Sequence, residues 1–151
     1  MLFIVCNWYS TKSLLWIRSS NESFPVRRIY CIVSNCADHA IGIGHDPNKE
    51  PPFFFQKNAQ NVDTSGTFTY LPQTSDVHYE VELVVTLKSG GADISLEAAL
   101  EHVYRYWLGL DMTRGDLQGV VKKLGRPWEV GKSFEKSAPM SELVPARETG
   151  H

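Results

Sequence analysis

Three acidic residues of this sequence stand at spacings that would suit a hard divalent cation. Glu80 and Glu82 lie within the alternating run Val77–Leu87, and Asp111 follows further along the chain. Successive side chains of a strand point to opposite faces, so both glutamates would share one face, roughly 6–7 Å apart. Carboxylate oxygens are the ligands that Mg²⁺ and Mn²⁺ prefer. The pattern therefore indicates a metal site made of Glu80, Glu82 and Asp111.

The same spacing also has a simpler interpretation. A Glu-x-Glu pair on a strand usually marks a face exposed to solvent, because ionised carboxylates are rarely buried. His78 would share the face of Glu80 and Glu82 and could be taken for a fourth ligand, but hard cations favour oxygen. We therefore expect His78 to be a surface residue or to lie behind the ligands.

A metal site of this kind needs elements that bring Asp111 to the strand of the glutamates. The run Val77–Leu87 predicts one long strand, ended by Ser89-Gly-Gly91. A helix is predicted to begin at Ser95, an N-cap residue, and to deliver Asp111 beside that strand. The apolar stripe of this helix would face the core and consist of Leu96, Ala99, Leu100, Val103, Tyr104 and Trp107.

Shorter elements are predicted around these two. Arg27–Val33 is rich enough in β-branched and aromatic residues for a strand, and Phe53–Gln56 predicts a buried strand. Ala37–Ile43 could form a short helix, weakened by Gly42. Asn58–Gly66 is polar and predicts turns.

Composition fits a globular chain with one core. Its 151 residues are 42% hydrophobic and 21% charged, and the formal charge of −2 argues against a nucleic-acid partner. Cys6, Cys31 and Cys36 lack paired CxxC spacing, which argues against a zinc cage or a disulfide framework and favours a reducing, cytoplasmic location. Met1–Cys6 is apolar but is soon interrupted by polar residues, so we expect no membrane partner.

From Phe24 to its end the chain carries an ordered series of motifs. The early motifs are Phe24–Ile32, Asn35–Ala40 and Pro51–Lys57. The later ones are His78–Leu83, Leu110–Thr113, Asp116–Gln118 and Gly125–Phe134. In this order they resemble the fumarylacetoacetate hydrolase family, and most closely its fumarylpyruvate hydrolase branch.

This resemblance implies an α+β fold, a mixed β-rich roll of the fumarylacetoacetate hydrolase type with one principal helix. Residues 1–23 would form a divergent N-terminal segment, and residues 24–151 a partial catalytic domain. The family's domain normally continues to a Thr-Gly-Thr-Pro motif, which this sequence does not contain, so we expect the C-terminal half of the roll to be missing. Members of the family commonly dimerise, which implies a homodimer for a complete chain.

The resemblance also implies a reaction. Glu80, Glu82 and Asp111 fall on the family's metal positions, where Mg²⁺ (or Mn²⁺) is expected. His39 falls on the histidine that activates water. The implied reaction is the metal-assisted hydrolysis of a carbon–carbon bond in a small oxo-acid, an acylpyruvate such as fumarylpyruvate, which gives pyruvate and fumarate.

Three further residues are implied to contact the substrate. Lys132 would neutralise a substrate carboxylate or enolate and so be catalytic, Gln118 would donate a hydrogen bond, and Lys57 matches a recurrent family lysine. Each has a structural alternative. Lys132 and Lys57 could be solvated surface charges, and a lone histidine such as His39 is more often a structural hydrogen-bonding residue.

The sequence departs from the family pattern near the expected substrate. Gly42 stands where a glutamate would orient His39, and Gly115 stands where an arginine usually follows Arg114. Val33-Ser34-Asn35-Cys36 replaces a common Gly-Arg-Asn-Tyr. Two alternatives therefore remain. The chain could be a truncated, catalytically impaired member that binds a metal or assembles with a related chain, or it could act as an oxaloacetate decarboxylase or oxo-acid isomerase.

Overall fold

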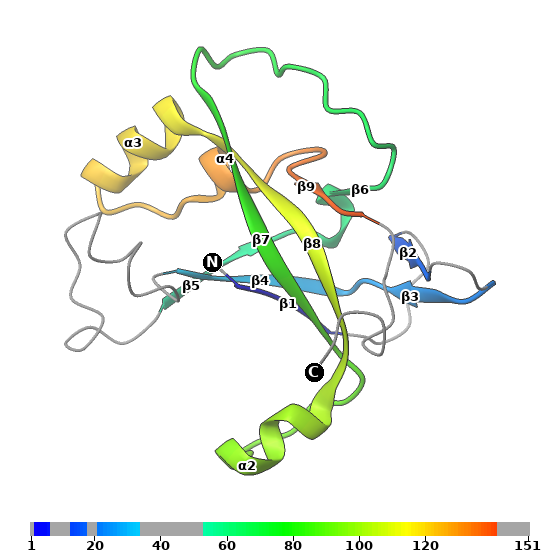
Figure 1. The fold of residues 1–151 in the computed structure, drawn as a ribbon. Coiled ribbons are helices and arrows are strands. Elements are labelled where there is room, and N and C mark those ends of the chain that lie inside the picture. Colours follow the sequence, from blue (N-terminus) through cyan, green and yellow to red (C-terminus); the bar gives the residue numbers. More distant parts are fainter. Residues whose placement is uncertain (1, 7–12, 18–20, 34–52, 142–151) are drawn as a thin grey trace.

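A pair of long antiparallel strands, β7 (Val77–Leu87) and β8 (Val103–Arg114), dominates the computed structural model (Figure 1). The structure describes residues 2–6, 13–17, 21–33 and 53–141. The other strands are β1 (Leu2–Cys6), β2 (Leu14–Trp16), β3 (Ser23–Pro25), β4 (Arg28–Val33), β5 (Phe53–Lys57), β6 (Val62–Asp63) and β9 (Ala138–Pro139). The helices are α2 (Leu96–Ala99), α3 (Gly115–Lys123) and α4 (Glu129–Lys132), with 3-10 turns η1 (Ala59–Asn61) and η2 (Leu100–His102).

Five of these strands form one mixed sheet in the order β5-β4-β1-β7-β8. β1 lies at its centre, antiparallel to β4 and parallel to β7, with Leu2 paired to Leu83. The N-terminal segment predicted for residues 1–23 therefore supplies the middle strand of the sheet. This strand-rich architecture with few helices confirms the predicted fold class.

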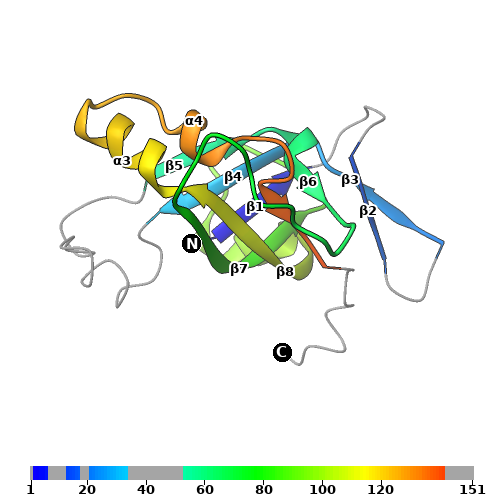
Figure 2. The same ribbon diagram turned by 90° about the horizontal axis from the view of Figure 1, so that it is seen from above.

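The remaining elements surround the sheet. The hairpin of β2 and β3 lies to one side, and α3 and α4 lie at the opposite side, near the end of β8 (Figure 2). The short α2 projects beyond the far end of the β7–β8 pair (Figure 1). None of the helices within the described ranges is long and apolar enough to cross a membrane.

The predicted strand with alternating faces is confirmed as β7, but its acidic face is turned inward. Tyr79, Val81 and Leu83 are 70%, 65% and 49% exposed, whereas Glu82 is only 5% exposed. Val84, on the face of Glu82, is fully buried. The simple interpretation of a solvent-facing acidic pair is therefore wrong for Glu82, because this face covers the interior of the roll.

The prediction of a long helix beginning at Ser95 is wrong. Ser95 does cap a helix, accepting a hydrogen bond from the Ala98 backbone, but α2 ends at Ala99. Leu96 of α2 and Leu100 of η2 are exposed rather than in the core, by 86% and 73%. The aromatic stretch around Trp107 belongs to β8 and pairs with β7, because aromatic side chains suit a pleated, half-buried surface. The principal helix is instead α3, which follows β8 directly.

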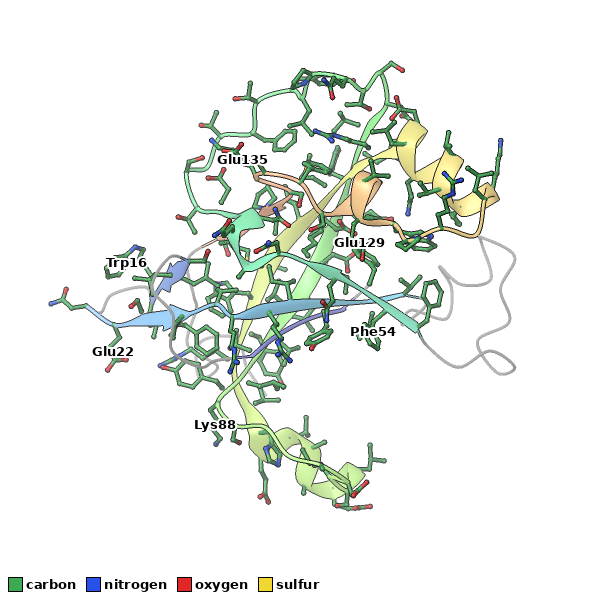
Figure 3. The ribbon with its side chains drawn as sticks, turned by 180° about the vertical axis from the view of Figure 1, so that it is seen from behind. Trp16, Glu22, Phe54, Lys88, Glu129 and Glu135 are labelled. Carbon is green, nitrogen blue, oxygen red and sulfur yellow. The ribbon has the colours of Figure 1, made fainter. Side chains whose placement is uncertain are left out.

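Two of the shorter predicted elements are confirmed as strands. The strand predicted at Arg27–Val33 is confirmed as β4, and β5 confirms a strand over Phe53–Gln56. Burial of that strand holds for Phe55 but not for Phe54, which is 59% exposed. Phe54 and Trp16 lie at opposite sides of the molecule (Figure 3). The helix predicted at 37–43 lies outside the described residues.

The hydrophobic core packs between the sheet and the β2–β3 hairpin. Trp107 from β8 stands edge-on to Phe24 from β3, with ring centroids 6.1 Å apart, and the Trp107 indole donates to the Ser141 carbonyl. Cys31 is a buried free thiol in this core. Burial, together with the nearby Asp111 carboxylate, raises the pKa of Cys31, so the thiol stays protonated at neutral pH.

Candidate metal and substrate site

The three predicted carboxylates gather on the inner face of the β7–β8 pair. Glu80 lies directly opposite Asp111 across the two strands, and Glu82 follows two residues along on the same face. Asp111 is fully buried, and Glu82 is nearly so. The antiparallel register therefore brings side chains about thirty residues apart in sequence into one acidic cluster.

Lys132 of α4 points its ammonium into this cluster. Its Nζ donates to Glu80 Oε2 at 3.0 Å, to Asp111 Oδ2 at 2.7 Å and to Thr113 Oγ1 at 2.7 Å. Burial alone would lower the pKa of Lys132, but the two carboxylates outweigh it and raise the pKa. The alternative of a solvated strand-end lysine is therefore wrong, because Lys132 is buried on a helix and stays charged.

Lys57 of β5 reaches the other side of the same aspartate. Its Nζ lies 2.9 Å from Asp111 Oδ1 and donates to the backbone carbonyls of Met112 and Lys132. The side chain is only 2% exposed, so the alternative of a surface charge is wrong here too. Burial lowers the pKa of Lys57 despite the attraction of Asp111.

One oxygen of Asp111 has unused hydrogen-bonding capacity. Lys57 Nζ forms an ion pair with Asp111 Oδ1 at 2.9 Å, and within the described part of the chain no well-aligned hydrogen bond reaches this buried atom. A buried acceptor of this kind is expected to take a partner. The oxygen is suited to a hard cation, as are the neighbouring glutamates.

The carboxylates fit a divalent ion in chemistry but do not yet form a cage. Among the described residues no three His, Cys, Asp or Glu side chains are arranged to hold a metal ion. The Lys132 ammonium lies within hydrogen-bond distance of both Glu80 and Asp111. A divalent ion would have to displace that ammonium, so the triad of ligands stays a prediction.

Gln118 is positioned by the close packing of two helices. It lies in the middle of α3, and Gly131 of α4 packs directly against its backbone. A Cβ at Gly131 would come within 2.8–2.9 Å of the Gln118 backbone and Cβ. The glycine thus lets α4 approach α3 and brings Gln118 into the neighbourhood of Lys132.

Sequence reasoning missed Thr113 as a member of the cluster. This residue is 2% exposed, accepts from Lys132 and lies opposite His78 across the strands. Thr113 stands two residues after Asp111, so the period of a strand would have placed it on the same face. The prediction of a helix before Asp111 hid that pattern.

Gly115, where the family pattern has an arginine, is closely packed by neighbouring side chains. A Cβ there would lie 2.4 Å from Asp76 Oδ2 and 3.0 Å from His78 Cε1. His78 itself is exposed and pairs with Asp76 at 2.7 Å, which agrees with the surface role expected for it. Asp116 accepts from Thr74 and from the Ser75 backbone, so this loop is tied to the start of α3. An arginine at position 115 would require the loop to move.

The predicted general base cannot be placed. His39 and Gly42 both lie outside the described residues. The residues brought together are therefore Glu80, Glu82, Asp111 and Lys132, with Lys57 behind them.

Burial makes Glu82 a test of the acidic cluster. Burial raises the pKa of Glu82 in the folded protein. The contribution of protonated Glu82 to stability is therefore complete below the ordinary pKa of 4.5, and it is lost as the pH rises through the folded-state pKa. We expect Glu82→Gln to be more stable than the wild type at neutral pH in a chelator. This advantage should shrink as the pH falls toward 4.5. Urea unfolding across pH 4–8 measures both effects, with Glu101→Gln, at an exposed glutamate, as a control. Equal stability of Glu82→Gln and wild type at pH 7 would contradict the expectation.

Comparisons with known proteins agree with this architecture. The chain is 46% identical over 101 residues to the fumarylpyruvate hydrolase of Ralstonia sp, covering 66% of this chain and 53% of that protein. It is 37% identical over 121 residues to a mitochondrial oxaloacetate decarboxylase of Dictyostelium discoideum, covering 79% of this chain and 55% of that protein. The chain thus spans about half the length of these curated relatives.

A solved structure is also similar throughout. The fumarylpyruvate hydrolase of Pseudomonas aeruginosa, in complex with Mn²⁺ and pyruvate, superposes with a TM-score of 0.83 at 47% identity. The match covers 96% of this chain and 65% of that one. A family model described as fumarylacetoacetate (FAA) hydrolase C-terminal matches residues 28–151. The acidic cluster, the strand-rich roll and these similarities together show that the chain belongs to the fumarylacetoacetate hydrolase family.

Proposed function

We propose that this chain carries the catalytic cluster of a divalent-metal-dependent hydrolase acting on an acylpyruvate such as fumarylpyruvate. The observation that carries the proposal is the convergence of Glu80 and Asp111 on one buried cation, the Lys132 ammonium. Similarity to fumarylpyruvate hydrolases, one of them holding Mn²⁺ and pyruvate, supports the choice of substrate.

Glu80, Glu82 and Asp111 would hold the ion, which we propose to be Mg²⁺ or Mn²⁺. When bound, such an ion polarises carbonyl oxygens and stabilises negative charge that develops on an oxo-acid. The exchange would replace the single positive charge of Lys132 beside Glu80 and Asp111 with two positive charges. That gain of positive charge would prepare the site for an anionic substrate.

The side chains of the chain would divide the remaining work. In the proposed hydrolysis, the water oxygen joins the distal carbonyl carbon, and the bond from that carbon to the pyruvyl methylene breaks. The electron pair of that bond passes to the pyruvate enolate, which then takes up a proton. Lys132 would neutralise the enolate, Gln118 would donate a hydrogen bond to the substrate, and His39 would remove the proton from water.

Loss of the ultraviolet absorbance of fumarylpyruvate tests this function. With purified protein and Mg²⁺ or Mn²⁺ present, we expect absorbance to fall at a rate proportional to protein concentration, and Glu80→Ala to abolish that fall. Glu101→Ala is the matched control, since it removes an exposed glutamate of η2, outside the strands that carry the cluster. A chelator should stop the reaction. Decay that persists in chelator, or none at high protein concentration, would refute the proposal.

Oxo-acid chemistry without hydrolysis is the second candidate. The similarity to an oxaloacetate decarboxylase favours it. Oxaloacetate offered to the same protein would release carbon dioxide if decarboxylation is the activity. An isomerase would change only its keto–enol ratio.

A catalytically impaired member remains the third candidate. Calorimetric binding of Mn²⁺ without turnover of either substrate would identify it. Size-exclusion chromatography would then report whether the protein is the homodimer that we propose or associates with a related chain.

A further inference from the structure

The Lys57 ammonium is engaged by three groups within the protein. It donates to the Met112 and Lys132 carbonyls and forms an ion pair with Asp111 Oδ1 at 2.9 Å. The side chain is 2% exposed. Its partners belong to β8 and to α4, the two elements that carry the acidic cluster and Lys132.

The packing around Lys57 joins β5 and α4 reciprocally. Lys57 lies over the ring of Phe134, 5.6 Å from its centroid, and Lys132 lies over the ring of Phe55 at 5.3 Å. Each lysine thus rests on an aromatic ring from the other lysine's segment, a contact that stabilises cations. We name Phe55, Lys57, Lys132 and Phe134 the β5–α4 junction.

The two lysines grip opposite oxygens of one carboxylate. Lys57 contacts Asp111 Oδ1, whereas Lys132 contacts Oδ2. The Lys132 ammonium also donates to Glu80 and Thr113. Lys132 therefore holds the side of the aspartate that faces the cluster. Lys57 holds the opposite oxygen and at the same time bonds the backbone of the residue that carries the competing ammonium.

We propose that Lys57 is a positioning residue, which fixes the Asp111 carboxylate and helix α4 relative to each other, and not a substrate ligand. Its influence on metal binding rests on the proposed function, because it acts through Asp111. Its influence on α4 does not, because the bond to the Lys132 carbonyl joins β5 directly to α4. Residues that orient metal ligands from behind affect metal affinity although they never touch the metal.

Two variants and one control test the inference. Lys57→Met removes all three contacts, and Lys57→Gln retains a neutral donor in case the methionine variant does not fold. Leu15→Ala is the control, since Leu15 is fully buried in β2 and its loss destabilises the core without touching the cluster. The readouts are Mn²⁺ affinity by titration calorimetry and hydrogen exchange of the α4 amides in chelator.

We expect Lys57→Met to weaken Mn²⁺ binding by about ten- to a hundredfold. Leu15→Ala should leave the affinity within about twofold, as expected for distant sites. Exchange of the Lys132 and Ser133 amides, which close the turn of α4, should accelerate more in Lys57→Met than in Leu15→Ala. Lys57→Gln should fall between wild type and Lys57→Met.

The outcomes separate this inference from the proposed function. Mn²⁺ affinity unchanged in Lys57→Met, or weakened equally by Leu15→Ala, overturns the positioning role. If wild-type protein binds no Mn²⁺, the proposed function fails, and the exchange measurement alone decides the role of Lys57. Unaltered α4 exchange in Lys57→Met and Lys57→Gln then overturns it.

Discussion

Asp111→Asn should lower the free energy of unfolding by about 3–5 kcal/mol, the usual loss when one partner of a buried ion pair is removed. Asp111 is fully buried and contacts two buried ammonium groups, those of Lys57 and Lys132. Lys132 keeps Glu80 as a partner in the variant, but Lys57 loses its only carboxylate contact among the described residues. Urea unfolding in a chelator at pH 7 measures the loss.

The pH dependence identifies the cause of that loss. Burial already lowers the pKa of Lys57, and without Asp111 it should fall further. The pKa of Lys57 in the folded protein lies below its unfolded value of 10.5. Between these two pKa values the unfolded chain binds more protons than the folded one, so stability rises with pH. The deficit of Asp111→Asn should therefore shrink as the pH is raised toward 10.5. A deficit that does not change with pH would point to lost packing instead.

Thr113→Val provides the graded control for this prediction. It keeps the shape of a buried side chain and removes only one hydrogen bond to Lys132. We expect a loss of about 1 kcal/mol, typical of a single hydrogen bond, with little dependence on pH below 9. If Thr113→Val is as destabilising as Asp111→Asn, the carboxylate has no special role in the stability of the cluster.

Lys132→Met should separate metal binding from turnover. The ammonium lies between Glu80 and Asp111, where it competes with an incoming divalent ion. Its removal should leave Mn²⁺ affinity unchanged or tighter, while kcat for fumarylpyruvate falls by about a hundred- to a thousandfold through loss of charge stabilisation. Calorimetry and the absorbance assay measure the two effects on the same preparation.

Lys122→Met is the matched control for this variant. Lys122 lies on α3, over the ring of Trp128. The substitution therefore removes a lysine charge near α4 but outside the cluster. Its affinity and turnover should resemble those of wild type. Weaker Mn²⁺ binding in Lys132→Met alone would contradict the competition that the structure indicates.

Strand periodicity was sufficient to predict the part of the site that lies on β7. Alternation along Val77–Leu87 places Glu80 and Glu82 on one face, and the structure has them there. Which face is buried was not predictable from polarity, because the charges that neutralise these carboxylates come from elsewhere. Lys57 is on β5 and Lys132 is on α4, and no sequence pattern around the glutamates predicts a contact with either lysine.

The false helix has an equally physical origin. Leu96, Leu100 and Val103 recur with helical spacing after a good N-cap, so the apolar stripe satisfied the helical pattern. The same stretch continues into β8, where pairing with β7 supplies more long-range contacts than an isolated helix could. Only the partner strand decides between the two patterns, and a single sequence does not contain that information in readable form.

The central place of β1 has a consequence for how the chain reaches its fold. β1 and its parallel neighbour β7 lie roughly eighty residues apart in the chain, so the middle of the sheet depends on contacts of high sequence separation, which slow folding.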